Sequence, residues 1–113
     1  CYKAQVLRTS QLCASFLGLE EQKWGVSFQS RIGPGWLTPF SDVKFKELPK
    51  RGLKRIAVVC PSFLVDNLET LEEVNIRGRE TFMNAGGKNF NYIPCLNEDN
   101  IWIECLANIL SKR

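Results

Sequence analysis

The sequence predicts an α/β fold in which a Rossmann-like parallel sheet is flanked by helices. Residues 55–60 (RIAVVC) form an apolar, mostly β-branched run, which is typical of a strand buried on both faces of a parallel sheet. Segments with helical and strand-like spacing alternate along the 113 residues in the order αβαβαβα, without an internal repeat or a linker. This alternation favours parallel strands joined by right-handed crossovers.

One helix and one strand are expected ahead of a loop rich in Gly and Pro. Residues 4–17 place apolar side chains at helical spacing, and Gly18 ends that pattern. Residues 24–28 (WGVSF) predict a short strand. The Gly and Pro content of residues 29–40 then argues against regular structure.

A second helix is expected before the strand at residues 55–60. Ser41 and Asp42 can cap a helix that runs to about residue 48, and Pro49 and Gly52 end it. The positions expected to face inward are Val43, Phe45 and Leu48.

The second half of the chain is expected to hold two more helices and one more strand. Residues 66–84 form a long helix that stops at the glycines of residues 85–87, residues 89–93 form a strand, and residues 98–110 form a closing amphipathic helix. The buried stripe of the long helix is expected to contain Leu68, Leu71, Val74 and Phe82.

Composition and charge exclude several classes of protein. The 15 Lys and Arg residues are interspersed with 12 Asp and Glu residues to a net charge of +3, so no basic block predicts nucleic-acid binding. No apolar run approaches the ~18 residues of a membrane span, and the first residues lack the apolar core of a signal peptide. We therefore expect a cytoplasmic chain. Because it begins at Cys1 and not at Met, we expect that it starts inside a longer protein or has been processed.

The five cysteines are scattered and form no C-x-x-C pair. The chain contains no His to complete a zinc site or a Ser-His-Asp or Cys-His arrangement. The residues 33–35 (GPG) lack the spacing of a phosphate-binding loop. We expect the internal members of the set to be reduced thiols packed as small hydrophobic residues; the five are Cys1, Cys13, Cys60, Cys95 and Cys105.

Three loops are expected to share one rim of the sheet and to carry the function. Residues 29–36, 61–69 and 94–97 each follow a predicted strand, and ligands of parallel sheets bind beyond the carboxyl ends of the strands.

The acidic residues at the start of the long helix have two interpretations. As a solvated face, Glu69, Glu72 and Glu73 complement the helix dipole, and Glu73 pairs with Arg77 at i,i+4. As a functional site, Glu69 binds a metal ion or moves a proton, while Glu73 one turn further along tunes it.

The loop at residues 29–36 also has two interpretations. Trp36 either covers the edge of the sheet or offers a flat face on which a planar ligand can stack. Gln29, Ser30 and Arg31 are either ordinary loop residues or hydrogen-bond donors and a cation for the carboxylates of such a ligand.

Four groups of residues, taken together, resemble ferrochelatase. They cover nearly the whole chain in the order found in that family, and four motifs in register are far more specific than one. They are Cys1-Tyr2-Lys3-Ala4-Gln5, then Phe28-Gln29-Ser30-Arg31-Ile32-Gly33 with Trp36-Leu37 and Pro39, then Asp66-x-Leu68-Glu69-Thr70-Leu71-Glu72-Glu73, and finally Ala85-Gly86-Gly87 followed by Tyr92-Ile93-Pro94-Cys95-Leu96-Asn97.

The resemblance implies that residues 1–113 are a carboxyl-terminal chelatase domain of an enzyme that inserts ferrous iron into a porphyrin to make haem. The porphyrin is protoporphyrin IX or a related dicarboxylate or tetracarboxylate porphyrin, and the amino-terminal half of the same enzyme is the expected partner. Glu69 matches the iron ligand or proton acceptor of the family, Glu73 matches its next acidic position, and Trp36 matches the tryptophan of its cleft.

The chain departs from the family in ways that limit what it can do alone. The family's catalytic His lies before the region matching Cys1, so the domain is expected to be incomplete and inactive by itself. Asn67 stands where relatives often have His, and the loop before Trp36 is one residue shorter. Fe²⁺ is expected as substrate; some members also carry an iron-sulfur cluster, which this chain does not support, and peripheral membrane contact stays open. The alternative is a non-catalytic α/β binding module.

Overall fold

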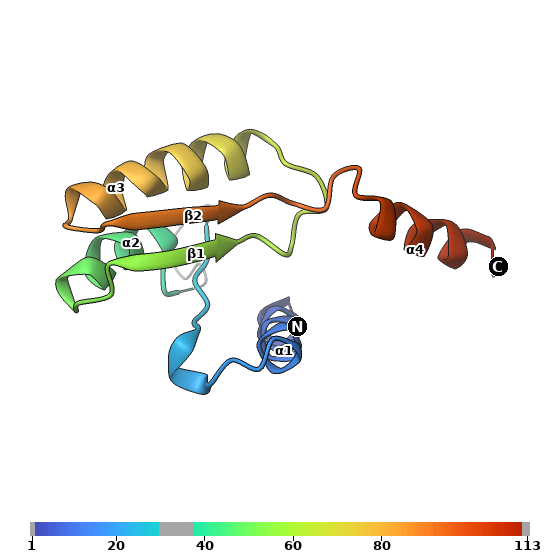
Figure 1. Cartoon of the computed structure of the whole chain (residues 1–113), viewed down its shortest axis with the longest axis horizontal. Helices are drawn as coiled ribbons and strands as arrows, with labels where there is room; N and C mark the ends of the chain where they lie inside the picture. The colour runs from blue at the N-terminus through green and yellow to red at the C-terminus, as the bar shows by residue number, and fades with distance from the viewer. Residues whose placement is uncertain (1, 30–37, 112–113) are drawn as a thin grey trace.

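The computed structural model describes residues 2–29 and 38–111, and Figure 1 shows their arrangement. A two-stranded parallel sheet lies against two helical segments, with a separate helix at each end of the chain. The elements are α1 (Tyr2–Phe16), the 3-10 turn η1 (Glu21–Lys23), α2 (Ser41–Lys50), β1 (Arg55–Val59), the π-helix η2 (Glu69–Gly78), α3 (Arg79–Asn84), β2 (Asn89–Ile93) and α4 (Asn100–Ser111).

The parallel sheet confirms the predicted α/β class. Strand β1 pairs with β2 in a register that runs from Arg55 opposite Asn89 to Val59 opposite Ile93. Helix η2 continues into α3 without a break, because the residues at their junction keep helical dihedral angles. Together η2 and α3 form the crossover between the two strands, and Figure 1 shows them as one continuous helix along the sheet.

The core lies between one face of the sheet and the helices α2, η2 and α3. Phe90 of β2 meets the ring of Phe45 edge-on at 5.4 Å between centroids and the ring of Phe82 at 5.8 Å. Phe82 is completely buried, and Val74 of η2 completes the cluster. Aromatic pairs at such distances contribute ~0.5–1.5 kcal/mol beyond the area they bury. The core therefore fixes the position of η2 relative to the sheet.

The predicted strand at residues 24–28 is wrong. Within the part of the chain that the structure describes, this segment makes only an isolated bridge between Phe28 and Phe40. The Phe28 N–H donates to the carbonyl of Pro39 at 2.8 Å, and the Ser41 N–H donates to the carbonyl of Phe28 at 2.9 Å. A strand needs several successive bridges of this kind. Here the backbone that follows Phe40 enters helix α2 after a single bridge.

The prediction that β1 is buried on both faces is also wrong for the described residues. Ile56 and Val58 are half-buried against the core, whereas Arg55, Ala57 and Val59 on the opposite face are exposed. The described helices pack on only one face of the sheet, so the apolar side chains of β1 are buried on that face alone.

The helix boundaries agree with the prediction to within about two residues, but details of their ends differ. Ser41 is the first residue of α2 and does not cap it, since Phe40 holds the cap position without a side-chain hydrogen bond. Pro49 lies inside the helix and is buried. Phe45 faces inward as predicted, whereas Val43 is exposed.

The predicted buried stripe of the long helix is half wrong. Val74 and Phe82 are buried, but Leu68 and Leu71 are 75% and 46% exposed. The buried positions of η2 and α3 instead recur at every fourth residue: Thr70, Val74, Gly78 and Phe82. An α-helix turns in about 3.6 residues, whereas the i→i+5 hydrogen bonds of a π-helix widen the turn and move the buried face along the sequence.

Helix α4 does not bury an apolar face within the described residues. Asp99 caps it by accepting hydrogen bonds from the N–H groups of Ile101 at 3.0 Å and Trp102 at 3.4 Å. Figure 1 shows α4 leading away from the sheet and its helices. No helix among the described residues is long and apolar enough to cross a membrane.

We expect Gly78→Ala to destabilise the protein, although alanine usually stabilises a helix by ~1 kcal/mol relative to glycine. The added Cβ would lie 2.7 Å from Cε2 of the buried Phe45 ring, so the core must shift at a cost of about 1–3 kcal/mol. Urea unfolding measures the change. Gly25→Ala is the matched control, because its Cβ would meet nothing within 4 Å; equal stability of both variants would contradict this packing.

Candidate functional site

Two of the three predicted rim loops meet at the carboxyl ends of β1 and β2. The N–H of Asn97 donates to the carbonyl of Leu64 at 2.8 Å, which joins the loop after β2 to the loop after β1. The predicted residues Ser30, Arg31 and Trp36 of the third loop lie outside the described residues. The rim is therefore confirmed for the two loops whose positions are known.

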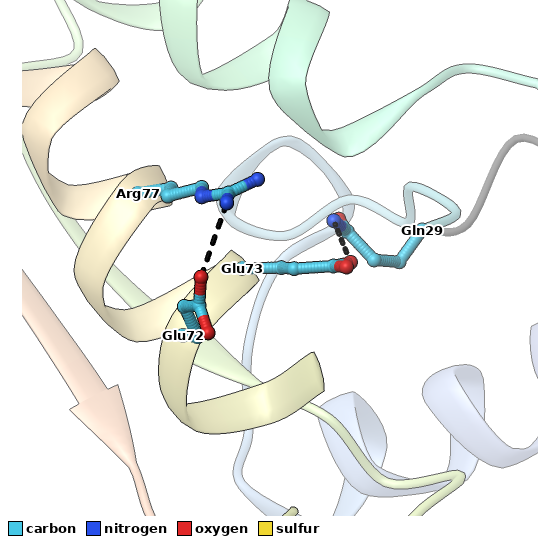
Figure 2. Close-up of polar contacts among 4 residues, drawn as sticks. All are labelled: Gln29, Glu72, Glu73 and Arg77. Carbon is cyan, nitrogen blue, oxygen red and sulfur yellow. Dashed lines mark hydrogen bonds and ion pairs between the residues drawn. The ribbon is translucent and has the colours of Figure 1, made fainter. Parts of the chain in front are cut away.

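The helix η2 starts at this rim and carries both acidic candidates. Glu69 is its first residue and is half-buried, and Glu73 lies one turn further along. The carboxylate of Glu73 accepts a hydrogen bond from Nε2 of Gln29 at 3.2 Å, as Figure 2 shows. The structure thus brings Glu73 together with a predicted substrate-binding residue.

Glu73 and Gln29 line a pocket of about 430 Å³ between α2 and η2. The pocket combines two carboxylates, one guanidinium, an amide and two aromatic rings, so it can hold a polar or charged group against an apolar wall. Glu69 is not among the lining residues, which are Phe28, Gln29, Asp42, Phe45, Glu73, Arg77, Gly78 and Thr81.

The predicted ion pair between Glu73 and Arg77 is wrong. Arg77 instead pairs with Glu72, with 3.0 Å between Nη2 and Oε1, and Figure 2 shows Glu73 directed towards Gln29. The spacing of this pair is i,i+5, which the winding of the π-helix brings onto one face. Both partners are largely exposed, and such surface pairs contribute ~0–1 kcal/mol.

A reciprocal pair of hydrogen bonds fixes the start of the helix. Oδ1 of Asn67 accepts from the N–H of Thr70 at 3.2 Å, and Oγ1 of Thr70 accepts from the N–H of Asn67 at 3.0 Å. This is the arrangement of a capping box, in which two otherwise unpaired donors are satisfied. Asn67 therefore caps the helix that carries Glu69.

Asp66 is the centre of a hydrogen-bond network that the sequence did not predict. Its Oδ1 accepts from the hydroxyls of Tyr92 at 2.5 Å and Thr70 at 3.0 Å. Its Oδ2 accepts from the N–H of Cys95 at 3.2 Å and from Nδ2 of Asn97 at 2.8 Å. The feature of the sequence that could have pointed to this role is the position of Asp66 just before the start of a helix.

These hydrogen bonds shift the ionisation of the network. The bonds from Tyr92 and Asn97 hold the pKa of Asp66 well below its usual range, although partial burial opposes them. Burial and the bond to Asp66 raise the pKa of Tyr92. Asp66 is therefore a carboxylate and Tyr92 a neutral phenol at neutral pH.

The thiols near the rim are protonated. Burial first, and then the neighbouring Cys95 and Glu69, raise the pKa of Cys60 to about 11. Burial also raises the pKa of Cys95. The prediction of reduced, packed thiols holds for buried Cys95, whereas Cys13 and Cys105 are free but exposed because α1 and α4 present them to solvent.

No group of three or more Cys, Asp or Glu side chains in the described residues converges as a metal site. Glu69 and Glu73 instead offer oxygen donors along one helix, and such donors bind a divalent cation or accept a proton.

Comparison with known proteins identifies relatives along the whole chain. The family model for ferrochelatase matches residues 1–113. The ferrochelatase of Pseudomonas paraeruginosa is 49% identical over 113 residues, which cover 99% of this chain and 33% of the relative. That of Opitutus terrae is 50% identical over 109 residues, covering 96% and 32%. The chain spans about a third of the length of the curated relatives it matches.

We expect the stability of the protein to fall in acid in a way that depends on Asp66. Its folded pKa lies below the usual value of 3.8, so the unfolded state binds more protons as the pH drops below about 5. Its contribution is complete above that range and is lost as pH falls towards the folded pKa. Urea unfolding at pH values from about 6 to 3 should show a shallower decline for Asp66→Asn; identical slopes would contradict this role.

Proposed function

We propose that this chain, which belongs to the ferrochelatase family, forms part of an enzyme that inserts ferrous iron into a porphyrin to make haem. The observation that carries the proposal is the family match over all 113 residues, with Glu69 and Glu73 on one helix at the carboxyl edge of the sheet. Edges of this kind are where α/β enzymes bind their ligands.

Glu69 acts as iron ligand or proton acceptor, and Glu73 acts one turn further along the same helix. The porphyrin loses two pyrrole protons as Fe²⁺ enters, so the site needs a base as well as donors that release the metal again. Carboxylates meet both needs because they bind Fe²⁺ more weakly than thiolates do. The position of Glu73 in a pocket with Gln29 supports the part assigned to Glu73, and the place of Glu69 at the start of the same helix supports the part assigned to Glu69.

The porphyrin is a dicarboxylate or tetracarboxylate such as protoporphyrin IX. Trp36 stacks on its plane, and Gln29, Ser30 and Arg31 bind its carboxylates. This part of the proposal is supported by the family resemblance of the motif at residues 28–39 and by the position of Gln29 in the pocket.

The remaining part of the enzyme supplies the opposite side of the cleft. This chain contains no histidine, so the imidazole that faces Glu69 in the family comes from the amino-terminal part of the same protein. That part is the partner of this domain, and the fraction of the relatives that the chain spans supports its existence.

In the full-length enzyme we expect Glu69→Gln to lower the rate of iron insertion at least 100-fold, since an amide neither accepts the proton nor neutralises the metal. The measurement is the loss of porphyrin fluorescence under anaerobic conditions with ferrous iron. Glu72→Gln is the matched control. It removes the same charge from the same helix, but its carboxylate pairs with Arg77 at the surface, so its rate should stay within about two-fold of wild type. Equal loss in both variants would point to a general effect of charge.

The isolated 113-residue chain should not metallate porphyrin, because it provides the carboxylates without the imidazole. Fluorescence of protoporphyrin mixed with ferrous iron and the purified chain should stay constant. Restoration of activity by adding the separately expressed amino-terminal part would show that the site is shared. Haem formation by the chain alone would overturn the assignment of a divided site.

A further inference from the structure

We propose that Asp66 is a positioning residue for Glu69, which it holds in place through Thr70. The inference rests on the proposed function, because it assumes that Glu69 takes part in the reaction. Asp66 itself need not touch iron or porphyrin, since its oxygens are engaged within the protein.

The carboxylate of Asp66 is fully hydrogen-bonded by donors from η2, from β2 and from the loop after β2. It accepts four hydrogen bonds, from the side chains of Tyr92, Thr70 and Asn97 and from the backbone of Cys95. Its own N–H donates to Oδ1 of Asn97 at 2.8 Å. The loop after β1 is therefore tied to β2 and to the loop that follows it.

Thr70 connects this network to the helix start. Its side chain is completely buried, and its hydroxyl donates to Asp66 at 3.0 Å while accepting from the N–H of Asn67. Glu69 directly precedes Thr70 in η2. Because Thr70 is held by bonds on both its hydroxyl and its N–H, the backbone beside it, including that of Glu69, is held in place, which sets the point from which the Glu69 side chain extends.

The ionised carboxylate is the form that suits this network. All four contacts are made by donors, so each requires an acceptor oxygen. An asparagine at position 66 has only one acceptor oxygen: an NH₂ facing Cys95 and Asn97 would leave those two donors unpaired, and an NH₂ facing Tyr92 and Thr70 would require their hydroxyls to accept instead of donate. The low pKa of Asp66 agrees with the need for an ionised carboxylate at this position.

A purely structural role makes a different prediction. If Asp66 only ties the two loops together, then loss of the Tyr92 hydroxyl should damage the enzyme as much as loss of the Thr70 hydroxyl. If Asp66 acts on Glu69, the bond through Thr70 matters for the chemical step and the bond from Tyr92 matters mainly for stability.

The test measures kcat and KM of the full-length enzyme with ferrous iron and protoporphyrin, together with thermal stability. We expect Thr70→Val to lower kcat about 10-fold with little change in the porphyrin KM, because misplacement of a reacting group acts on the chemical step. Thr70→Ser keeps the hydroxyl and should restore kcat to within about two-fold of wild type. Tyr92→Phe should lower the melting temperature while keeping kcat within about two-fold.

The double variant Asp66→Asn with Thr70→Val gives an independent check. Its kcat should stay within about two-fold of that of Asp66→Asn alone, since both changes break the bond between Thr70 and Asp66, although Thr70→Val also removes the acceptor of the Asn67 N–H. If Asp66→Asn does not fold, the comparison of Thr70→Val, Thr70→Ser and Tyr92→Phe still decides between the positioning role and the purely structural role. Equal loss of kcat in Thr70→Val and Tyr92→Phe, or failure of Ser to rescue, would overturn the inference. A wild-type enzyme without metallation activity, or full activity in Glu69→Gln, would instead overturn the proposed function.

Discussion

The wide winding of η2 is the constraint on which both the core and the candidate site depend. Its i→i+5 hydrogen bonds move the buried face to every fourth residue, so the helix packs through small and polar residues at its start and through aromatic rings at its end. The same winding places Glu72 beside Arg77 and turns Glu73 towards Gln29. Glu73 and Arg77 both line the pocket, but the guanidinium of Arg77 pairs with Glu72, so the Glu73 carboxylate contacts Gln29 instead.

The helix is held at both ends by different kinds of interaction. At its amino end, the charge of Asp66 and the cap formed by Asn67 and Thr70 fix its position through directional hydrogen bonds. At its carboxyl end η2 continues into α3, whose Phe82 is buried against Phe90. Polar anchoring near the site and apolar packing away from it suit a functional helix, because hydrogen bonds set the orientation of side chains more narrowly than hydrophobic contacts do.

The local sequence pattern was sufficient to predict those strands that find a pairing partner among the described residues. The β-branched run of β1 and the segment of β2 form the expected parallel pair, and the position of Glu69 at the carboxyl edge follows from that pairing. The segment at residues 24–28 has strand-like composition but only one bridge, because pairing depends on a neighbouring strand that composition does not reveal. The π-helix escaped prediction for a related reason, since the expected stripe assumed about 3.6 residues per turn.

The Asp66 network could not be predicted, because three of the partners of Asp66, which are Tyr92, Cys95 and Asn97, lie 26 to 31 residues away along the chain. They meet only when β1 and β2 are in register, and a lone Asp before a helix otherwise indicates no more than a cap. Oxygen donors on one rigid helix are suited to holding a divalent metal weakly and in a defined place. Insertion further requires a donor facing them across the porphyrin, and a chain without histidine leaves that second role to the rest of the enzyme proposed here. For the role proposed for Glu69, the placement of its carboxylate matters more than its affinity for the metal, and the positioning role proposed for Asp66 serves that need.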